Sequence, residues 1–127
     1  MANKFRQFTT SSGKLCLAGK DAETNEKLIS EIIKDKKDYY VLHTAKPGSP
    51  FVVIKEEIKK ITKQDIKEAA IFCAKYSREW KKAKIKKDIE VHYFLGKNIH
   101  KEKGMKTGTF GVRKFKEIKL KKKEIEG

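Results

Sequence analysis

A chain of 127 residues with 32 Lys and Arg against 17 Asp and Glu has a formal net charge of +15. Self-repulsion of that size favours a polyanionic partner, and the length fits one domain. No apolar run approaches the roughly 20 residues of a membrane span, and the N-terminus lacks an apolar leader, so we predict a soluble, cytoplasmic protein with no membrane partner.

The first elements are predicted to be a hairpin and a helix. Residues 4–8 and 14–18 have strand character, and the Thr-Ser-Ser-Gly at residues 10–13 favours a turn between them. Asp21 then follows Gly19 and begins a segment with acids at its start and lysines at its end, as the helix dipole favours. Asp21 is expected to cap this helix, although an acid at that place could also serve in acid/base chemistry.

The middle of the chain predicts two central strands and a long helix. Residues 39–44 and 51–54 are rich in β-branched and aromatic side chains, and a rigid Pro-Gly-Ser-Pro turn joins them. The amides of Gly48 and Ser49 in that turn either bind an anion or simply connect the strands, and both readings stay open. Thr62 to Asp65 resembles a capping box before the longest helical pattern, which carries apolar residues on one face as far as Trp80.

The last third predicts a basic linker and three strands. Residues 81–87 hold five lysines, residues 90–94 have strand character, and residues 109–113 and 115–120 look like a final pair of strands. The expected fold class is α+β, with a twisted mixed or antiparallel sheet packed against two main helices. One domain should cover residues 1–120, followed by a basic, frayed C-terminal tail at residues 121–127.

A stretch rich in lysine and glycine, residues 96–114, is the leading candidate for phosphate binding. It holds six Lys and Arg, four glycines and one acid, and residues 63–127 as a whole have 20 basic against 9 acidic residues. Glycines let a partner approach the backbone while lysines supply mobile charge, although lysines also protect edge strands. With the basic linker, the residues predicted to contact nucleic acid are Lys81, Lys82, Lys84, Lys86, Lys87, Lys97, Lys101, Lys103, Gly104, Lys106, Gly108, Arg113 and Lys114.

Other residues that carry chemistry have simpler interpretations. Cys16 and Cys73 lie inside apolar patterns and are predicted to be reduced core residues. Trp80, Tyr76 and Phe72 offer stacking surfaces for unpaired bases, but Trp80 shares its helical face with apolar residues and is expected in the core. The three histidines lack metal-ligand spacing and no catalytic motif is present, so we predict no metal, no cofactor and no enzymatic activity.

Several motifs resemble the NFACT-R domain and fall in that family's order over nearly the whole chain. The opening motif is Phe5-x-x-Phe8-x-x-Ser11-Ser12-Gly13-x-Leu15, followed by Gly19-Lys20-Asp21-Ala22-x-x-Asn25-Glu26. The later motifs are Pro47-Gly48-Ser49 before Val52-Val53-Ile54, Glu68-Ala69-Ala70 with Tyr76-Ser77, and Lys101-x-Lys103-Gly104-x-Lys106-x-Gly108.

The resemblance implies an RNA-binding module, best known as one part of larger NFACT proteins that bind the large ribosomal subunit and tRNA during rescue of stalled nascent chains. At 127 residues the chain has no room for the other NFACT domains, so a stand-alone module is expected and only RNA or ribosome binding carries over. Two histidines common in the family correspond here to Leu42 and Pro50, and His43 falls one residue late, which on a strand turns its side chain to the opposite face.

The function predicted from the sequence is therefore non-catalytic binding of ribosomal RNA or tRNA on the large ribosomal subunit, in a quality-control or translation-linked role. Recognition should be mainly electrostatic and set by RNA shape. One alternative is an accessory or catalytic subunit in RNA modification or repair, with Asp21 and His43 near a pocket. Another is a DNA-binding module, because phosphate contacts do not distinguish the polymers.

Overall fold

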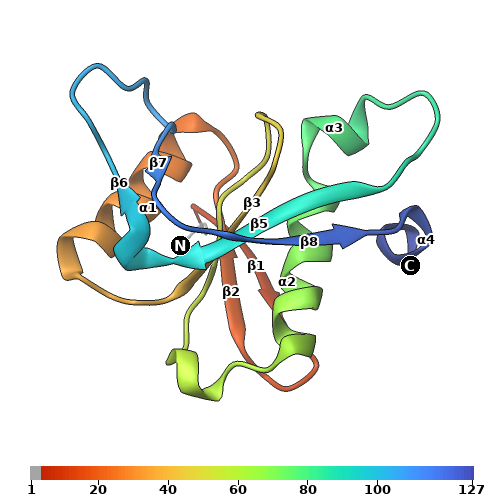
Figure 1. Cartoon of the computed structure of the whole chain (residues 1–127), viewed down its shortest axis with the longest axis horizontal. Helices are drawn as coiled ribbons and strands as arrows, with labels where there is room; N and C mark the ends of the chain where they lie inside the picture. The colour runs from red at the N-terminus through yellow and green to blue at the C-terminus, as the bar shows by residue number, and fades with distance from the viewer. Residues whose placement is uncertain (1–3) are drawn as a thin grey trace.

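The fold is built on a six-stranded antiparallel sheet, here seen in a computed structural model that describes residues 4–127 (Figure 1). Its strands, in the order β1-β2-β4-β3-β5-β8, are β1 (Arg6–Thr9), β2 (Leu15–Ala18), β4 (Val52–Ile54), β3 (Tyr40–Thr44), β5 (Ile89–Leu95) and β8 (Lys116–Leu120). A separate hairpin pairs β6 (Ile99–His100) with β7 (Gly111–Val112). The helices are α1 (Ala22–Asp35), α2 (Lys63–Lys75), α3 (Arg78–Lys81) and α4 (Lys122–Glu126), with 3-10 turns η1 (Ile58–Lys60) and η2 (Gly96–Asn98). The predicted α+β class is confirmed.

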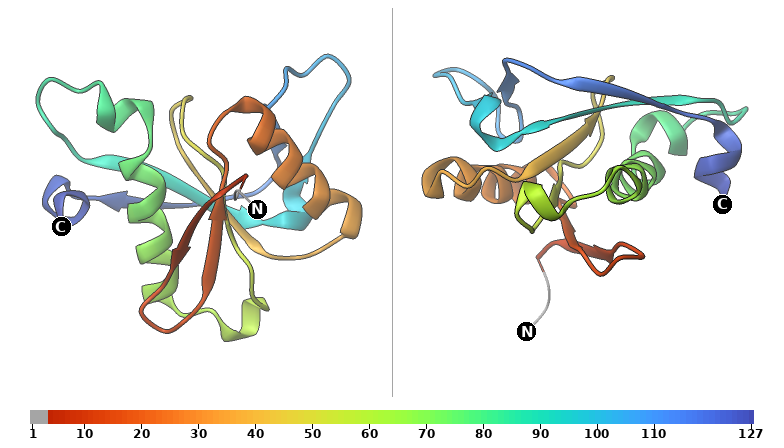
Figure 2. Two further views of the ribbon diagram at one scale, coloured as in Figure 1. Left: turned by 180° about the vertical axis from the view of Figure 1, so that it is seen from behind. Right: turned by 60° about the horizontal axis from the view of Figure 1, so that its bottom comes forward.

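The two main helices cover opposite faces of the sheet (Figure 2). Because successive strand residues point to opposite faces, β3 and β4 divide their apolar side chains between two cores. Val41 and Val53 pack with α1, whereas Leu42 and Val52 pack with α2. All four side chains are fully buried, and the two strands lie at the centre of the sheet as predicted.

Asp21 caps α1, as the sequence predicted. Its carboxylate Oδ1 accepts the Thr24 backbone N–H at 2.8 Å, and the Thr24 hydroxyl in turn accepts the Asp21 N–H at 3.0 Å. The Thr24 N–H and the Thr24 hydroxyl both donate to this carboxylate, and they hold the pKa of the Asp21 carboxyl below its usual value. The helix ends at Lys36, whose φ of 54° places it in the left-handed region.

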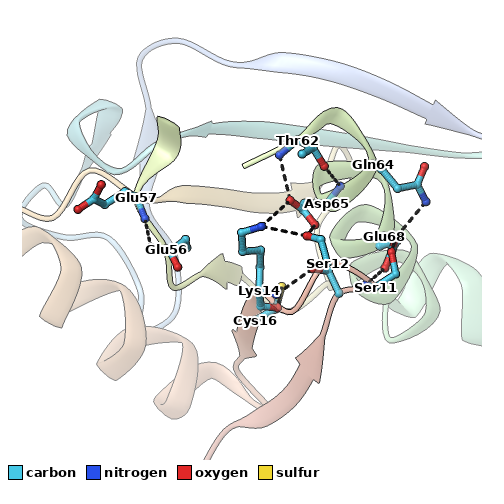
Figure 3. Close-up of polar contacts among 11 residues, drawn as sticks. Ser11, Ser12, Lys14, Cys16, Glu56, Glu57, Thr62, Gln64, Asp65 and Glu68 are labelled. Atoms are coloured by element: carbon cyan, nitrogen blue, oxygen red, sulfur yellow. Dashed lines mark hydrogen bonds and ion pairs between the residues drawn. The ribbon is translucent and has the colours of Figure 1, made fainter. Parts of the chain in front are cut away.

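The predicted capping box at the start of α2 is also confirmed, and it belongs to a cluster of polar side chains around the buried Asp65 (Figure 3). Asp65 has no exposed surface, and its Oδ1 accepts the Ser12 hydroxyl at 2.6 Å while its Oδ2 accepts the Thr62 N–H at 2.9 Å. Lys14 Nζ lies 3.5 Å from the same carboxylate. Glu68 accepts both the N–H and the hydroxyl of Ser11, so the β1–β2 turn is tied to α2.

The long helical pattern is divided into two helices, a difference from the sequence prediction. Trp80 is buried as expected, but α2 ends at Lys75 and α3 begins after Ser77. The Ser77 hydroxyl donates to the Ala74 carbonyl at 2.7 Å and accepts the Trp80 N–H at 3.2 Å, so it closes one helix and caps the next. The break lets α3 turn toward the β3–β4 connection, because the Arg78 N–H donates to the Gly48 carbonyl.

The end of the chain also differs from the prediction. The two strands expected as a final pair do not pair with each other, since β7 pairs with β6 and β8 pairs with β5. Residues 121–127 were expected to be a frayed tail, but residues 122–126 form α4. Ile125 is fully buried in the core on the α2 side, and Lys67 forms an ion pair with Glu124. The buried Ile125 and this ion pair hold the short helix against α2.

Candidate nucleic-acid interface

A groove of about 620 Å³ opens at the end of the sheet where the β3–β4 turn lies. The turn stands between the start of α1 on one side and α3 on the other, and β7 lies in front of α1 (Figure 1). The start of α1, the residues before β7 and the residue before β8 line it together with α3. Segments from the whole length of the chain therefore meet at one surface.

The charge of the groove is positive. Four cationic side chains line it, from β1, the start of α1 and α3, together with two histidines. Asp21 is the acid in the lining, and its carboxylate is already engaged as the cap of α1. An anion that enters the groove therefore meets cations, and the carboxylate in the lining is already hydrogen-bonded within the protein. The cations and histidines are Arg6, Lys20, Arg78, Lys81, His43 and His92.

Aromatic rings lie among these charges. Tyr76 is 37% exposed, with the Arg6 guanidinium 4.3 Å and the Lys81 ammonium 5.3 Å from its ring centroid. Phe115 is 48% exposed and stacks on His92, with the centroids 4.0 Å apart. Proteins hold unpaired nucleic acid with exposed aromatic rings, which stack on the bases, and with cations, which contact the phosphates.

His43 and His92 face each other across β3 and β5 on the α1 side of the sheet. His43 Nδ1 lies 2.7 Å from the Thr44 carbonyl, which can only accept, so the neutral ring has its proton on Nδ1 and can accept at Nε2. Burial lowers the pKa of His43 and His92 adds to that effect, so the ring is neutral at pH 7. Leu42, the neighbouring strand residue, points into the opposite core.

His92 also contacts two carboxylates. Its Nε2 lies 3.2 Å from Glu90 and 4.0 Å from Glu117, which is its register partner on β8. One atom that could bind a metal ion, a ring nitrogen or a carboxylate oxygen, is offered by each of Glu90, His92 and Glu117, and these three atoms lie within 4.8 Å of one another. The spacing of the histidines did not indicate this cluster of side chains, because Glu117 comes from another strand.

The lysine-rich and glycine-rich segment forms one wall of the groove, but not as a set of exposed lysines. Lys101 Nζ donates to the Glu26 carboxylate at 2.9 Å and to the carbonyls of Lys106 and Thr109 at 2.6 and 2.7 Å. The Gly108 N–H donates to the same Glu26 oxygen at 2.8 Å. Lys101 therefore holds the loop against α1, and its charge is used inside the protein.

The other predicted lysines of this segment lie at the surface. Lys103 and Lys106 are exposed, and within residues 4–127 their ammonium groups have no hydrogen bond or ion pair. Gly104 lies between them with a φ of +95° and open space around it. Lys97 is exposed as well, with its backbone N–H bonded to Asp38. Those three lysines remain available to a partner.

The basic linker divides in the same way. Lys81 lines the groove, whereas Lys86 donates to the Trp80 carbonyl at 2.6 Å and covers the Trp80 ring. Lys87 lies 3.4 Å from Glu79. Lys82 and Lys84 are exposed, and neither ammonium has an ion pair or hydrogen bond in the described part of the chain. Lys81, Lys82, Lys84 and Lys87 are therefore exposed cations of this cluster, and Lys87 alone among them has an ion pair within residues 4–127.

Gly48 and Ser49 both line the groove, but the Ser49 side chain serves the turn itself. Its hydroxyl accepts the Thr44 N–H at 3.0 Å and donates to the Pro50 carbonyl at 3.1 Å. Gly48 has a φ of +96°, and a Cβ there would lie 2.9 Å from the Arg78 Cβ. Glycine is required at this position so that α3 can approach the turn.

A second hollow of about 540 Å³ adjoins the first, since Phe115 borders both. Arg113 and Lys114 line it, as does Lys116, and all three are exposed. Arg113 and Lys114 were predicted to bind nucleic acid, and they lie together with Phe115 at the start of β8.

Comparison with known proteins identifies the family. The family model for the NFACT protein RNA binding domain matches residues 4–114. The chain belongs to this family. The match covers β1 through β7, which includes the loop that Lys101 closes and every residue of the groove lining except Phe115.

One curated protein resembles this chain in sequence, and one solved structure resembles it in fold. Over 78 residues the domain is 41% identical to the archaeal Rqc2 homolog aRqcH of Methanocaldococcus jannaschii, a match that spans 61% of this chain and 11% of that protein. The solved C-terminal part of the fibronectin/fibrinogen-binding protein from Streptococcus suis has the same fold, with a TM-score of 0.80 at 22% identity. That comparison covers 99% of this chain and 49% of the other. This chain thus spans about a tenth of the archaeal protein and about half of the streptococcal chain.

Sequence reasoning did not single out several groove residues of this NFACT RNA-binding domain. Arg6, Arg78 and Phe115 stand in unremarkable local surroundings, on β1, α3 and the approach to β8. The fold alone brings them together, although a phenylalanine between Lys114 and Lys116 was a usable signal for an exposed ring among cations. Among residues 4–127, no helix is long and apolar enough to cross a membrane.

Proposed function

We propose that this domain is a non-catalytic RNA-binding module that docks on ribosomal RNA or tRNA at the large ribosomal subunit. The groove and the exposed lysines around it form the contact surface. Its role is in ribosome-associated quality control or another translation-linked process in the cytoplasm.

The observation that carries the proposal is the charge of the groove. Arg6, Arg78 and Lys81 converge on one concave surface whose lining acid, Asp21, caps a helix. Phosphate contacts position a protein on RNA, and a concave basic surface with exposed rings suits backbone and base together. Membership of an RNA-binding family and likeness to an archaeal Rqc2 homolog support RNA and the ribosome as the partners.

A pair of matched charge variants tests this surface. Arg78→Gln with Lys81→Gln removes two groove cations, whereas Lys59→Gln with Lys60→Gln removes two exposed cations from η1, at the opposite end of the sheet from the groove (Figure 1). Affinity for an RNA of defined length is measured over a range of salt concentrations. The groove variant should lose about tenfold or more in affinity and lower the salt slope by about 1.4 to 1.8 for two phosphate contacts. Equal losses in the two variants would contradict the groove as the binding surface.

The ribosomal partner needs a separate test. Sedimentation with purified large ribosomal subunits should show the protein in the pellet at low salt and release at high salt, as electrostatic binding requires. Crosslinking in cells followed by sequencing of the attached RNA should enrich ribosomal or transfer RNA. Enrichment of neither would refute the ribosome while leaving RNA binding in place.

A catalytic role in RNA modification or repair is the second candidate, because Asp21 and His43 both border the groove. Asp21→Ala and His43→Ala separate the two proposals. If a variant still binds RNA but no longer turns over an RNA substrate, a catalytic role is favoured. If Asp21→Ala loses RNA binding only because it no longer folds, the role of Asp21 as helix cap is favoured. Competition of bound RNA by DNA of matched length tests the third possibility, a DNA-binding module.

A further inference from the structure

Phe115 is the most exposed aromatic ring of the described chain, and it does not contribute to either core. Its exposed fraction of 48% compares with 5% for Phe94 and 4% for Phe51. A large apolar side chain gains free energy by burial, so a ring held at the surface forgoes that gain. The surroundings of Phe115 show what an exposed ring does here.

One face of the Phe115 ring is fixed and the rest is open. The ring lies parallel to His92 within 18°, with the centroids 4.0 Å apart. His92 is itself positioned by its place on β5 and by Glu90, 3.2 Å from its Nε2. Phe115 is thereby a rigid platform backed by a second ring, and it needs little ordering when a flat ligand stacks on it.

Cations surround the platform. Arg113, Lys114 and Lys116 are exposed and line the same hollow, whose lining contains no Asp or Glu among residues 4–127. Glu117 is the nearest acid along the strand, and its carboxylate lies 4.0 Å from His92 Nε2. A flat π surface with cations on both sides along the chain fits an unpaired nucleotide, with its base on the ring and its phosphates on the flanking charges.

We propose that Phe115, backed by His92, is a stacking site for an unpaired RNA base, so that the domain prefers single-stranded or looped-out nucleotides over a continuous duplex. This rests on the proposed RNA-binding function and specifies its substrate. Phe115 borders both hollows, so the RNA strand can continue from this ring into the groove. There Tyr76 offers a second exposed ring.

The test compares RNA binding by Phe115→Ala and Phe115→Tyr, with Leu15→Ala as the control. Leu15 is 39% exposed on β2 and lines neither hollow, so its truncation removes exposed apolar surface away from the site. A single-stranded RNA containing 2-aminopurine and a duplex of equal length are the probes. Loss of one stacked base should weaken single-strand binding by about tenfold in Phe115→Ala, and Phe115→Tyr should retain it. The fluorescence quenching that accompanies stacking should vanish with Phe115→Ala alone.

The salt dependence separates stacking from charge. Phe115→Ala should leave the salt slope unchanged because it removes no phosphate contact, whereas Lys114→Gln should lower the slope by about 0.7. Duplex bound as tightly as single strand, or unaltered affinity in Phe115→Ala, would overturn the stacking site while RNA binding stands. Failure of the unaltered protein to bind either RNA would overturn the proposed function, and the stacking site with it.

Discussion

Glu26 on α1 and Lys101 in the loop after β6 form an ion pair of 2.9 Å, although they lie 75 positions apart in the chain. The same Glu26 oxygen accepts the Gly108 N–H at 2.8 Å. Burial raises the pKa of the Glu26 carboxyl, but the bonds from Gly108 and Lys101 outweigh it, so that the pKa is lowered and the carboxylate is charged at neutral pH. This pair fixes the wall of the groove to the helix.

Replacing Lys101 should loosen that wall. Lys101→Met keeps an unbranched apolar side chain over the Phe110 ring but removes all three donated hydrogen bonds. We expect a loss of about 1 to 2 kcal/mol in the free energy of unfolding and faster hydrogen exchange at the Gly108 amide. Lys103→Met is the control and should change stability by less than about 0.5 kcal/mol. Unchanged exchange at Gly108 in Lys101→Met would show that the loop closes without this lysine.

Two glycines of the same loop allow a matched test of close packing. Gly104 and Gly108 have φ values of +95° and +82°, so alanine is strained at both. A Cβ at Gly108 would lie 2.9 Å from Cα and O of Ala22. A Cβ at Gly104 would have no atom of residues 4–127 within 4 Å. Gly104→Ala should cost about 1 kcal/mol, and Gly108→Ala about 1 to 3 kcal/mol more because α1 or the loop must shift. Chemical denaturation gives both values, and equal losses would contradict the clash.

Features set by neighbouring residues could be predicted from the sequence. Asp21 and the Thr62 to Asp65 pair were recognised as caps because a cap needs only a polar side chain and the amides that follow it. The central strands were recognised because β-branched residues run together. The end of α2 was missed because Ser77, which ends it, sits at a position where the apolar periodicity continues to Trp80.

Features set by distant residues could not be predicted. The composition of residues 96–114 indicated a basic loop. It did not show that Lys101 forms an ion pair with Glu26 while Lys103 stays exposed. The groove likewise could not be recognised in the sequence, since its cations come from β1, the start of α1 and α3, which only the folded chain brings together. Ile125 shows the same limit, because one apolar residue among charges gives too weak a pattern to predict a packed helix.

Removal of the Ser77 hydroxyl should weaken the junction of α2 and α3. Ser77 is fully buried, and Ser77→Ala leaves the Trp80 N–H without its cap. We expect a loss of about 1 to 2 kcal/mol in the free energy of unfolding, seen as a lower melting temperature. Ser30→Ala, which removes one 3.3 Å bond to Glu26 within α1, should cost far less. A Ser77→Ala protein as stable as the parent would mean that α3 is held by Trp80 packing alone.

The two cysteines should be unreactive in the folded protein. Cys16 and Cys73 are fully buried, and burial raises the pKa of each thiol to about 12. Thiolate is the reactive form, so an aromatic disulfide reagent at pH 8 should label neither thiol until denaturant is added, and then label two per chain. Labelling of one thiol without unfolding would show that local opening exposes it.

Asp65 should make the stability of the protein depend on acid pH. Burial opposes its charge, but bonds from Ser12 and Thr62 outweigh burial and hold the pKa of this carboxyl far below its usual value. A carboxylate whose pKa is lowered by folding contributes stability above its unfolded-state pKa near about 4, and this contribution is lost as the pH falls toward the folded-state value. Asp65→Asn removes that contribution.

At pH 7 Asp65→Asn should therefore lower the free energy of unfolding by about 2 to 4 kcal/mol, because it also leaves Lys14 without its partner carboxylate. The difference from the parent should shrink as the pH falls from about 5 toward 2, since the parent then loses the same contribution. Urea denaturation at several pH values measures it, with the exposed Glu57→Gln as a control that should differ little at any of them. A difference between Asp65→Asn and the parent that stays constant down to pH 2 would mean that the neutral side chain loses packing, not charge.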